Sequence, residues 1–293
     1  MPRTKDNNRA TVNVFLFIAI FSLICFSACS NSHTTQIKSA QSVYDRVMKS
    51  GTIRCGYGIF PPYCMKDPNT GKLSGIFVDI LNEAGKNLSL KIDWAEEVGW
   101  ANIIQGLETD RYDVIPTGIW PNASRGKHGS FSIPLFYNVY KAYARQKDNR
   151  FDNDLQSINS ESVIIATIDG YTVQYIAQKR FPRARMLTHP DMCDGGQVFL
   201  DIVSNKADVT FADPSLAKIF LQSHPDSIKE VGKKPISLQS NTMMFKIGET
   251  AFKSMLDTAL TELINTGYVD TILNKYEPTP SVYLRVAKPY RTN

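Results

Sequence analysis

The sequence is short of the residues from which most catalytic and metal sites are built. Its 293 residues include four histidines and five cysteines, and the histidines are scattered without the spacing of metal ligands. There is no Gly-x-Ser-x-Gly segment, and Gly56-Tyr57-Gly58 lacks the third glycine of a dinucleotide-binding loop. We therefore expect no metal and no cofactor, although some catalytic sites leave no local signature.

An excess of one charge is also missing. The chain has 33 Lys and Arg against 28 Asp and Glu, a net charge of +5. Without residues 1–28, which carry three Lys or Arg and one Asp, the charge is +3 (5 − 3 + 1) over 265 residues (293 − 28). This mild balance does not indicate nucleic-acid binding. The length suits one large or two modest domains, and we expect a monomer.

Long apolar runs are absent except near the N-terminus. Residues 1–28 have the layout of a secretory signal, with three basic residues ahead of an apolar run at 12–26 that is short for a membrane span. The run ends in FSAC, which resembles a bacterial lipobox with Cys29 as the lipidated residue. Plain secretion and an uncleaved anchor are the alternatives. Residues 29–40 are polar and are expected to form a tether.

Three cysteines follow the N-terminal segment. Cys55 and Cys64 lie nine residues apart around a Gly-Pro turn, and an exported compartment permits a disulfide between them. Two buried thiols are the alternative, and Cys193 has no partner in either case.

Short apolar runs alternate with longer amphipathic ones, which favours an α/β fold. Strands are expected at 52–57, 90–94, 113–116, 163–167, 207–211 and 240–245. Helices are expected at 76–84, 100–107, 171–180, 197–205, from 213 onward, and over 249–277 with a break at Gly267. Asp113-Val114 and Asp208-Val209 each follow a helix and precede a loop, so the two halves echo each other weakly.

The order of these features resembles the periplasmic solute-binding proteins of family 3, the substrate-binding components of polar amino-acid ABC transporters. The resemblance runs through residues 51–277 and rests on segments that are individually weak but occur in the family's order. These segments are 51–56, 60–63, 71–80, Trp100, 112–114, 118–125, 131–134, 170–172, 206–213 and 259–276.

The resemblance implies a type II periplasmic-binding-protein fold, in which two α/β lobes are joined by two hinge strands and close on a ligand. Lobe 1 is expected at 51–138 and 240–277, lobe 2 is expected as an insertion at 142–235, and residues 278–293 form a C-terminal extension.

The resemblance also implies a ligand site between the lobes. Arg125 occupies the family position that pairs with a ligand α-carboxylate, and a guanidinium fork suits that role. Tyr171 and Thr172 open a helix whose N–H groups supply a second contact to the carboxylate. Asp213 matches the family aspartate for the α-ammonium, although Asp213-Pro214 is also a good helix start.

The remaining expected contacts form the walls of this site. Phe60 and Trp100 fall where the family stacks side chains against the ligand, and Gly118 belongs to the same loop as Arg125. Trp120 and Asn122 stand where relatives have small hydroxyl residues, so the pocket is expected to be reshaped. No acid occurs at 57–59, where many relatives that bind basic amino acids carry one, which argues against a basic amino acid as ligand.

These features lead us to expect a lipid-tethered periplasmic protein that captures a carboxylate-bearing solute for an ABC permease. The alternatives are an enzyme or a ligand sensor on the same fold, which is also known from a periplasmic cyclohexadienyl dehydratase. A dehydratase needs a general acid in the cleft, and Asp191, Asp194 and Asp213 are the candidates.

Overall fold

The computed structural model describes residues 41–277 and 282–286. The expected signal segment, the lipidation site at Cys29, the tether and most of the C-terminal extension lie outside these residues. None of the helices in the described ranges is both long and apolar enough to cross a lipid bilayer.

The described chain folds into two lobes, each built from alternating strands and helices. Lobe 1 contains α2 (Val43–Ser50), β1 (Thr52–Tyr57), β2 (Met65–Lys66), β3 (Leu73–Ser74), α3 (Ile76–Asn87), β4 (Lys91–Glu97), α4 (Ile103–Glu108), β5 (Val114–Ile119), η1 (Arg125–Lys127), β6 (Gly129–Phe131), α8 (Thr250–Asn265), α9 (Tyr268–Tyr276) and β13 (Tyr283–Arg285). Lobe 2 contains η2 (Leu155–Ile158), β8 (Ile164–Ile168), α5 (Thr172–Arg180), β9 (Arg185–His189), α6 (Gln197–Val203), β10 (Val209–Ala212), α7 (Pro214–Ser223) and β11 (Ile228–Val231).

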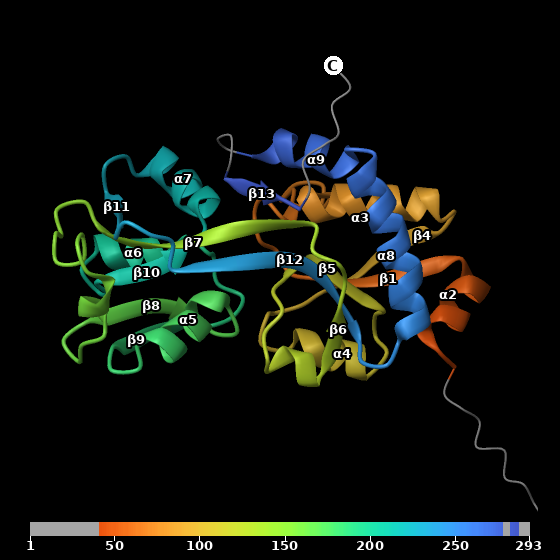
Figure 1. Cartoon of the computed structure of the whole chain (residues 1–293), viewed down its shortest axis with the longest axis horizontal. Helices are drawn as coiled ribbons and strands as arrows, with labels where there is room; N and C mark the ends of the chain where they lie inside the picture. Colours follow the sequence, from red (N-terminus) through yellow and green to blue (C-terminus); the bar gives the residue numbers. More distant parts are fainter. Residues whose placement is uncertain (1–40, 278–281, 287–293) are drawn as a thin grey trace, which may run out of the picture. The chain divides into compact units, whose positions relative to one another are not determined.

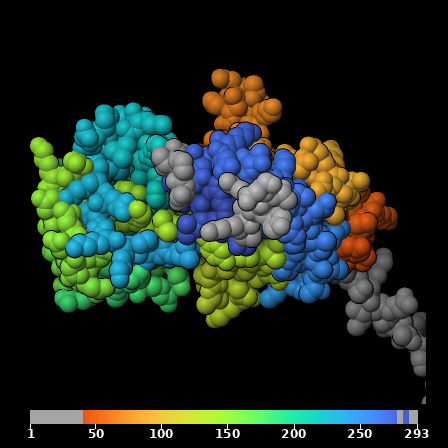
Figure 2. Space-filling view, turned by 45° about the horizontal axis from the view of Figure 1, so that its top comes forward, coloured from red at the N-terminus to blue at the C-terminus, as the bar shows by residue number. Residues whose placement is uncertain are grey.

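Two long strands, β7 (Phe136–Arg145) and β12 (Ser237–Lys246), run between the lobes (Figure 1). They pair antiparallel from Ser237 with Tyr140 to Asn241 with Phe136. The space-filling view shows the green and teal surface of lobe 2 to the left of the orange and blue surface of lobe 1 (Figure 2). The expected fold of two lobes joined by two hinge strands is confirmed.

The sheets of the two lobes have the same plan. In lobe 1 the order is β4-β1-β5-β12, with the first three strands parallel and β12 antiparallel. In lobe 2 the order is β9-β8-β10-β7, again with three parallel strands and one antiparallel hinge strand. The carboxyl ends of the parallel strands in each lobe are where an open α/β sheet places its ligand loops.

Each lobe has its own apolar core. In lobe 1, α3, α8 and α9 cover one face through buried residues such as Phe77, Leu260 and Leu273, while Ile103 and Leu107 of α4 pack on the other. In lobe 2, α5 contributes to one cluster, and α6 and α7 contribute to a second. The amphipathic spacing of these helices provides each sheet face with its apolar cover.

The weak echo between Asp113-Val114 and Asp208-Val209 has a structural basis. Asp113 Oδ2 accepts a hydrogen bond from the backbone N of Arg54 at the start of β1, and Asp113 pairs with the Arg54 and Arg46 guanidinium groups. Asp208 Oδ2 accepts from the backbone N of Ile164 at the start of β8 and pairs with two arginines in the same way. In each lobe, an aspartate before a strand therefore ties down the neighbouring parallel strand.

The structure departs from the sequence expectations at several elements. The helix expected at 100–107 begins only at Ile103, because residues 99–102 form a turn in which Asn102 N donates to Gly99 O. Helix α2 and strand β13, which the expected boundaries of lobe 1 omit, contribute Val47 and Tyr283 to its core. Cys55 and Cys64 are buried free thiols, which is the second of the two alternatives.

Strand β13 also connects lobe 1 to lobe 2. It pairs with the first residues of β7, and the hydroxyl of its Tyr283 lies 2.9 Å from Ser215 Oγ in α7. Both residues are buried. Nearby, the Tyr63 hydroxyl donates to Asp213 Oδ2 at 3.2 Å, a second hydrogen bond from lobe 1 to the start of α7.

Tyr283→Phe is expected to lower the free energy of unfolding by about 1–3 kcal/mol, because it leaves the buried Ser215 hydroxyl without its partner. Urea denaturation followed by tryptophan fluorescence measures the change. Tyr175→Phe, at a tyrosine that is 38% exposed, is the matched control and should change stability by less than about 0.5 kcal/mol. Equal stability of Tyr283→Phe and wild type would contradict this role.

Candidate functional site

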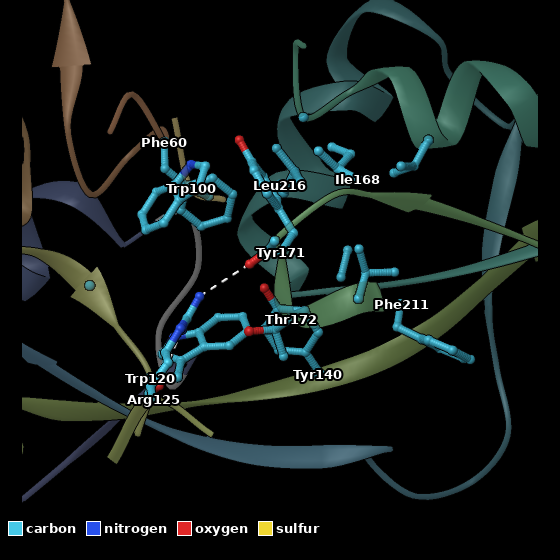
Figure 3. A pocket seen from close by; sticks show the side chains of 16 residues that line it. Phe60, Trp100, Trp120, Arg125, Tyr140, Ile168, Tyr171, Thr172, Phe211 and Leu216 are labelled. Carbon is cyan, nitrogen blue, oxygen red and sulfur yellow. Dashed lines mark hydrogen bonds between the residues drawn. The ribbon is translucent and has the colours of Figure 1, made fainter. Parts of the chain in front are cut away.

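A cavity lies between the lobes beside the hinge strands, and both lobes line it. Lobe 1 contributes Phe60, Trp100, Gly118, Trp120 and Arg125, and β7 contributes Tyr140. Lobe 2 contributes ten residues: Ile168, Gly170, Tyr171, Thr172, Val173, Gly195, Val198, Phe211, Ala212 and Leu216. Figure 3 shows Arg125 directed from the lobe 1 side toward Tyr171 and Thr172. Seven of the nine ligand contacts expected from the sequence are brought together here.

The cavity is small in this arrangement of the lobes. It has a volume of about 40 Å³, where a cavity needs roughly 10–15 Å³ to hold one water molecule, so it has room for a few waters. A ligand the size of an amino acid therefore enters and fits only when the lobes part or the aromatic side chains around the cavity move. The hinge strands provide the first of these movements.

Arg125 is the only charged residue among those that line the cavity. Its Nη1 donates to Trp120 O at 3.2 Å and its Nη2 donates across the cleft to Gly170 O at 3.1 Å. Within residues 41–277 and 282–286, no carboxylate forms an ion pair with it, and burial lowers the pKa of its guanidinium from the ordinary value. A partly buried cation whose side chain has only carbonyl partners favours an anionic ligand.

The first turn of α5 faces the same cation. Tyr171 is its N-cap residue, with extended backbone, and its side chain makes no capping hydrogen bond. Thr172 and Val173, which follow it, line the cavity. The N–H groups of a first helical turn and the positive end of the helix dipole attract anions. Because Arg125 donates to Gly170 just before this helix, the two positive features converge on one region.

Aromatic side chains form most of the remaining wall. Phe60, Trp100 and Tyr171 meet edge to face, with ring centroids 5.6–6.1 Å apart. On the hinge side, Trp120 meets Tyr140 edge to face at 4.5 Å. Burial raises the pKa values of the Tyr140 and Tyr171 phenols, so both remain neutral hydroxyls at neutral pH. The cavity therefore combines one cation with an apolar, aromatic surround.

Trp120 is held in place by the hinge. Its side chain is 7% exposed and belongs to the apolar cluster of lobe 2, although it follows β5 of lobe 1. Its Nε1 donates to Asn241 Oδ1 at 3.3 Å, and Asn241 Nδ2 donates to Asn138 Oδ1 at 2.8 Å. Asn241 and Asn138 lie on the two hinge strands, so Trp120 links the cavity wall to the segment about which the lobes move.

Two of the expected contacts, Asn122 and Asp213, do not line the cavity. Asn122 Oδ1 accepts a hydrogen bond from Arg125 N at 2.9 Å and shapes the loop that presents the arginine. Asp213 is 1% exposed, and its Oδ1 accepts from Ser215 N and Leu216 N at 2.8 and 3.1 Å as the N-cap of α7. Burial raises its pKa, against the effect of these bonds and of the bond from Tyr63. The candidate acids Asp191 and Asp194 are also absent from the lining.

Close approach of the lobes at the cavity depends on a glycine. Gly170 has φ +73°, and a Cβ at this position would lie 2.8 Å from the backbone N of Ala101 in lobe 1. A larger residue is therefore excluded by both backbone conformation and space. Beside it, Ala101 N donates to Asp191 Oδ2 at 3.2 Å.

Three prominent lining residues were missed by the sequence reasoning. Tyr140 lies on a hinge strand, Phe211 on β10 and Leu216 in the first turn of α7. An aromatic or aliphatic residue in a strand or helix is more often a core residue than a ligand contact, and Phe211 does also belong to the core of lobe 2. The position of Phe211 and Leu216 on either side of Asp213 was the available signal.

The sequence of this chain is similar to those of known proteins. The chain is 24% identical over 237 residues to a cyclohexadienyl dehydratase from Pseudomonas aeruginosa, covering 80% of this chain and 85% of that protein. It is 22% identical over 270 residues to an L-cystine-binding protein from Bacillus subtilis, covering 92% and 97%.

Solved structures show the same fold at low sequence identity. An ancestral amino acid-binding protein, described as a precursor of cyclohexadienyl dehydratase, superposes with a TM-score of 0.69 at 22% identity over 80% of this chain and 99% of that one. A cysteine-binding protein from Campylobacter jejuni superposes with a TM-score of 0.68 at 16% identity over 81% and 94%.

The family description "Bacterial extracellular solute-binding proteins, family 3" matches residues 53–279, which is most of the chain. These residues include most of lobe 1, all of lobe 2, both hinge strands and every residue that lines the cavity. The chain is therefore a member of the bacterial extracellular solute-binding proteins, family 3, and works outside the cytoplasm.

Proposed function

We propose that this protein captures a small carboxylate-bearing solute, an amino acid or a related acid, between its lobes and delivers it to an ABC transporter permease. The observation that carries the proposal is Arg125, a partly buried cation in the cavity whose guanidinium donates to the carbonyls of Trp120 and Gly170 and has no carboxylate partner among the described residues. The relatives that bind amino acids support the ligand class.

Capture follows from contacts to both lobes. A carboxylate at the cavity meets the Arg125 fork from lobe 1 and the first turn of α5 from lobe 2, and the aromatic walls bury its apolar part. Because both sets of contacts form only when the lobes close, the ligand stabilises the closed arrangement. The permease then distinguishes closed from open protein.

We further propose that Cys29 carries a lipid that holds the protein at the membrane surface, with residues 29–40 as the tether. Soluble secretion is the alternative. Mass spectrometry of the mature protein distinguishes the two, because a lipidated Cys29 adds acyl mass to a chain that begins at this residue.

A carboxylate requirement tests the function directly. We expect replacement of the ligand carboxylate by a neutral amide to weaken the binding free energy by at least about 1.5–3 kcal/mol, roughly tenfold or more in Kd, because a hydrogen bond to a charged group contributes about this much. Calorimetric titration of each binding acid and its amide measures the difference. Equal binding of acid and amide would contradict carboxylate capture.

Catalysis of the dehydratase type is the second candidate, favoured by the similarity to the Pseudomonas aeruginosa enzyme. Such a reaction needs a proton donor at the cavity, and Asp191, Asp194 and Asp213 do not line it. For this reason we favour binding over catalysis. Conversion of a cyclohexadienyl carboxylate to an aromatic product, followed by ultraviolet absorbance, would establish the enzyme instead.

A further inference from the structure

The C-terminal strand β13 lies against the hinge. It pairs antiparallel with the first residues of β7, from Tyr283 with Asn138 to Arg285 with Phe136 (Figure 1). The same residues of β7 pair with β12, the second hinge strand. Strand β13 is therefore a third strand at the segment about which the lobes move.

Arg285 holds β13 on lobe 1. Its guanidinium forms ion pairs with Glu277 and Asp270 and donates to Asn274 Oδ1 at 2.6 Å. These partners lie in α9 or directly after it. The backbone N of Tyr283 also donates to Glu277 Oε1 at 2.8 Å. Because charge-assisted hydrogen bonds of this kind are strong, we expect β13 to move together with lobe 1.

Tyr283 connects this strand to lobe 2. Its hydroxyl lies 2.9 Å from Ser215 Oγ in the first turn of α7. Tyr283 is 1% exposed and Ser215 is 0% exposed, so water does not compete for the bond. Burial raises the pKa of the Tyr283 phenol, which therefore remains a neutral hydroxyl at neutral pH. The lobes cannot separate at this place without breaking a buried hydrogen bond.

Tyr63 makes a second bond from lobe 1 to the same turn. Its hydroxyl donates to Asp213 Oδ2 at 3.2 Å, two residues before Ser215. The rings of Tyr63 and Tyr283 meet edge to face at 6.1 Å, and both pack against Phe136 at the start of β7. This packing fixes where the two hydroxyls point. The start of α7 is therefore held by two tyrosines of lobe 1.

We propose that Tyr283 of the C-terminal strand is a positioning residue for lobe closure, whose bond to Ser215 stabilises the closed arrangement of the lobes. The inference goes beyond the proposed function, because the bond acts on the lobes whatever ligand lies between them. Loss of one hydrogen bond of this kind changes an equilibrium by about 3- to 10-fold. An enclosed ligand leaves only after the lobes part, so the same bond prolongs its retention.

Fluorine NMR of the protein labelled with 5-fluorotryptophan measures opening without any added ligand, after refolding from denaturant has removed co-purified solutes. Trp100 meets Tyr171 of lobe 2 at 5.6 Å and reports closure. Trp94 meets Tyr57 within lobe 1 and is the internal reference. We expect Tyr283→Phe to raise the ratio of open to closed molecules about 3- to 10-fold at Trp100 and to leave the Trp94 signal unchanged.

Tyr276→Phe is the matched control. The Tyr276 hydroxyl donates to Asp79 Oδ2 at 2.9 Å, a bond that lies entirely within lobe 1. Its removal should leave the ratio at Trp100 at the wild-type value, even where it lowers the stability of the fold. Equal ratios in wild type, Tyr276→Phe and Tyr283→Phe would overturn the inference, because Tyr283 would then be an ordinary core residue.

A double-mutant cycle with Ser215→Ala assigns the effect to the bond itself. Tyr283→Phe, Ser215→Ala and the double variant should raise the ratio by similar factors, because each of them loses the same hydrogen bond. If the two single effects multiply in the double variant, the residues act independently, and the bond between them does not control closure.

Discussion

Arg125→Ala is expected to weaken binding of a carboxylate ligand by about 2–5 kcal/mol, roughly 30- to 4,000-fold in Kd, because truncating one partner of a buried charged pair leaves the other without compensation. Calorimetry with any carboxylate that binds the wild type measures this loss. Arg125→Lys should retain part of the affinity, since it keeps the charge but loses the planar fork that meets two oxygens at once.

The matched control lies two residues away in the same short helix. Lys127 is exposed, does not line the cavity and carries the same charge, so Lys127→Ala should leave the affinity within about twofold. Thermal denaturation of each variant without ligand shows whether folding is retained. If Arg125→Ala and Lys127→Ala bind the ligand equally well, Arg125 does not bind the ligand carboxylate.

Much of the fold follows from local patterns in the sequence. Alternating apolar runs predicted most strands and helices within a few residues, and Gly267 with its positive φ separates α8 from α9 as expected. Helix α2 was missed although Ser42 followed by Asp45 is a capping signal, and Ser42 Oγ does accept from Asp45 N. Strand β13 is only three residues long, and its pairing with β7 depends on contacts distant in sequence.

The sequence predicted those site residues that lie in a loop at a strand end or at the start of a helix. Arg125, Tyr171 and Thr172 come together because a strand end and a helix start meet across the cleft. Asp213 carried two signals at once, as a family contact and as a helix cap beside Pro214. The structure shows the cap, since two backbone N–H groups donate to the same carboxylate oxygen. The contact with a ligand ammonium stays a prediction, because a carboxylate has more acceptor sites than the cap uses.

Trp120→Ala is expected to lower the free energy of unfolding by about 3–5 kcal/mol, the usual cost of truncating a buried tryptophan. The ring packs on Tyr140, its Nε1 bonds to Asn241, and it is 7% exposed. Because the ring is also part of the cavity wall, its removal should move the preferred ligand toward acids with larger apolar bodies. Urea denaturation measures the first effect, and titration with carboxylates of increasing size measures the second.

Trp94→Ala is the control that separates the effect of Trp120→Ala on stability from its effect on ligand preference. Trp94 is partly buried on β4, meets Tyr57 edge to face at 5.9 Å and does not line the cavity. Its truncation should cost less stability and leave the order of ligand preference unchanged, since Trp120 and not Trp94 lines the cavity and bonds to a hinge asparagine. An unchanged size preference in Trp120→Ala would mean that Trp120 supports the hinge without selecting the ligand. The restriction on ligand size would then have to come from other apolar lining residues, such as Tyr140, Phe211 and Leu216.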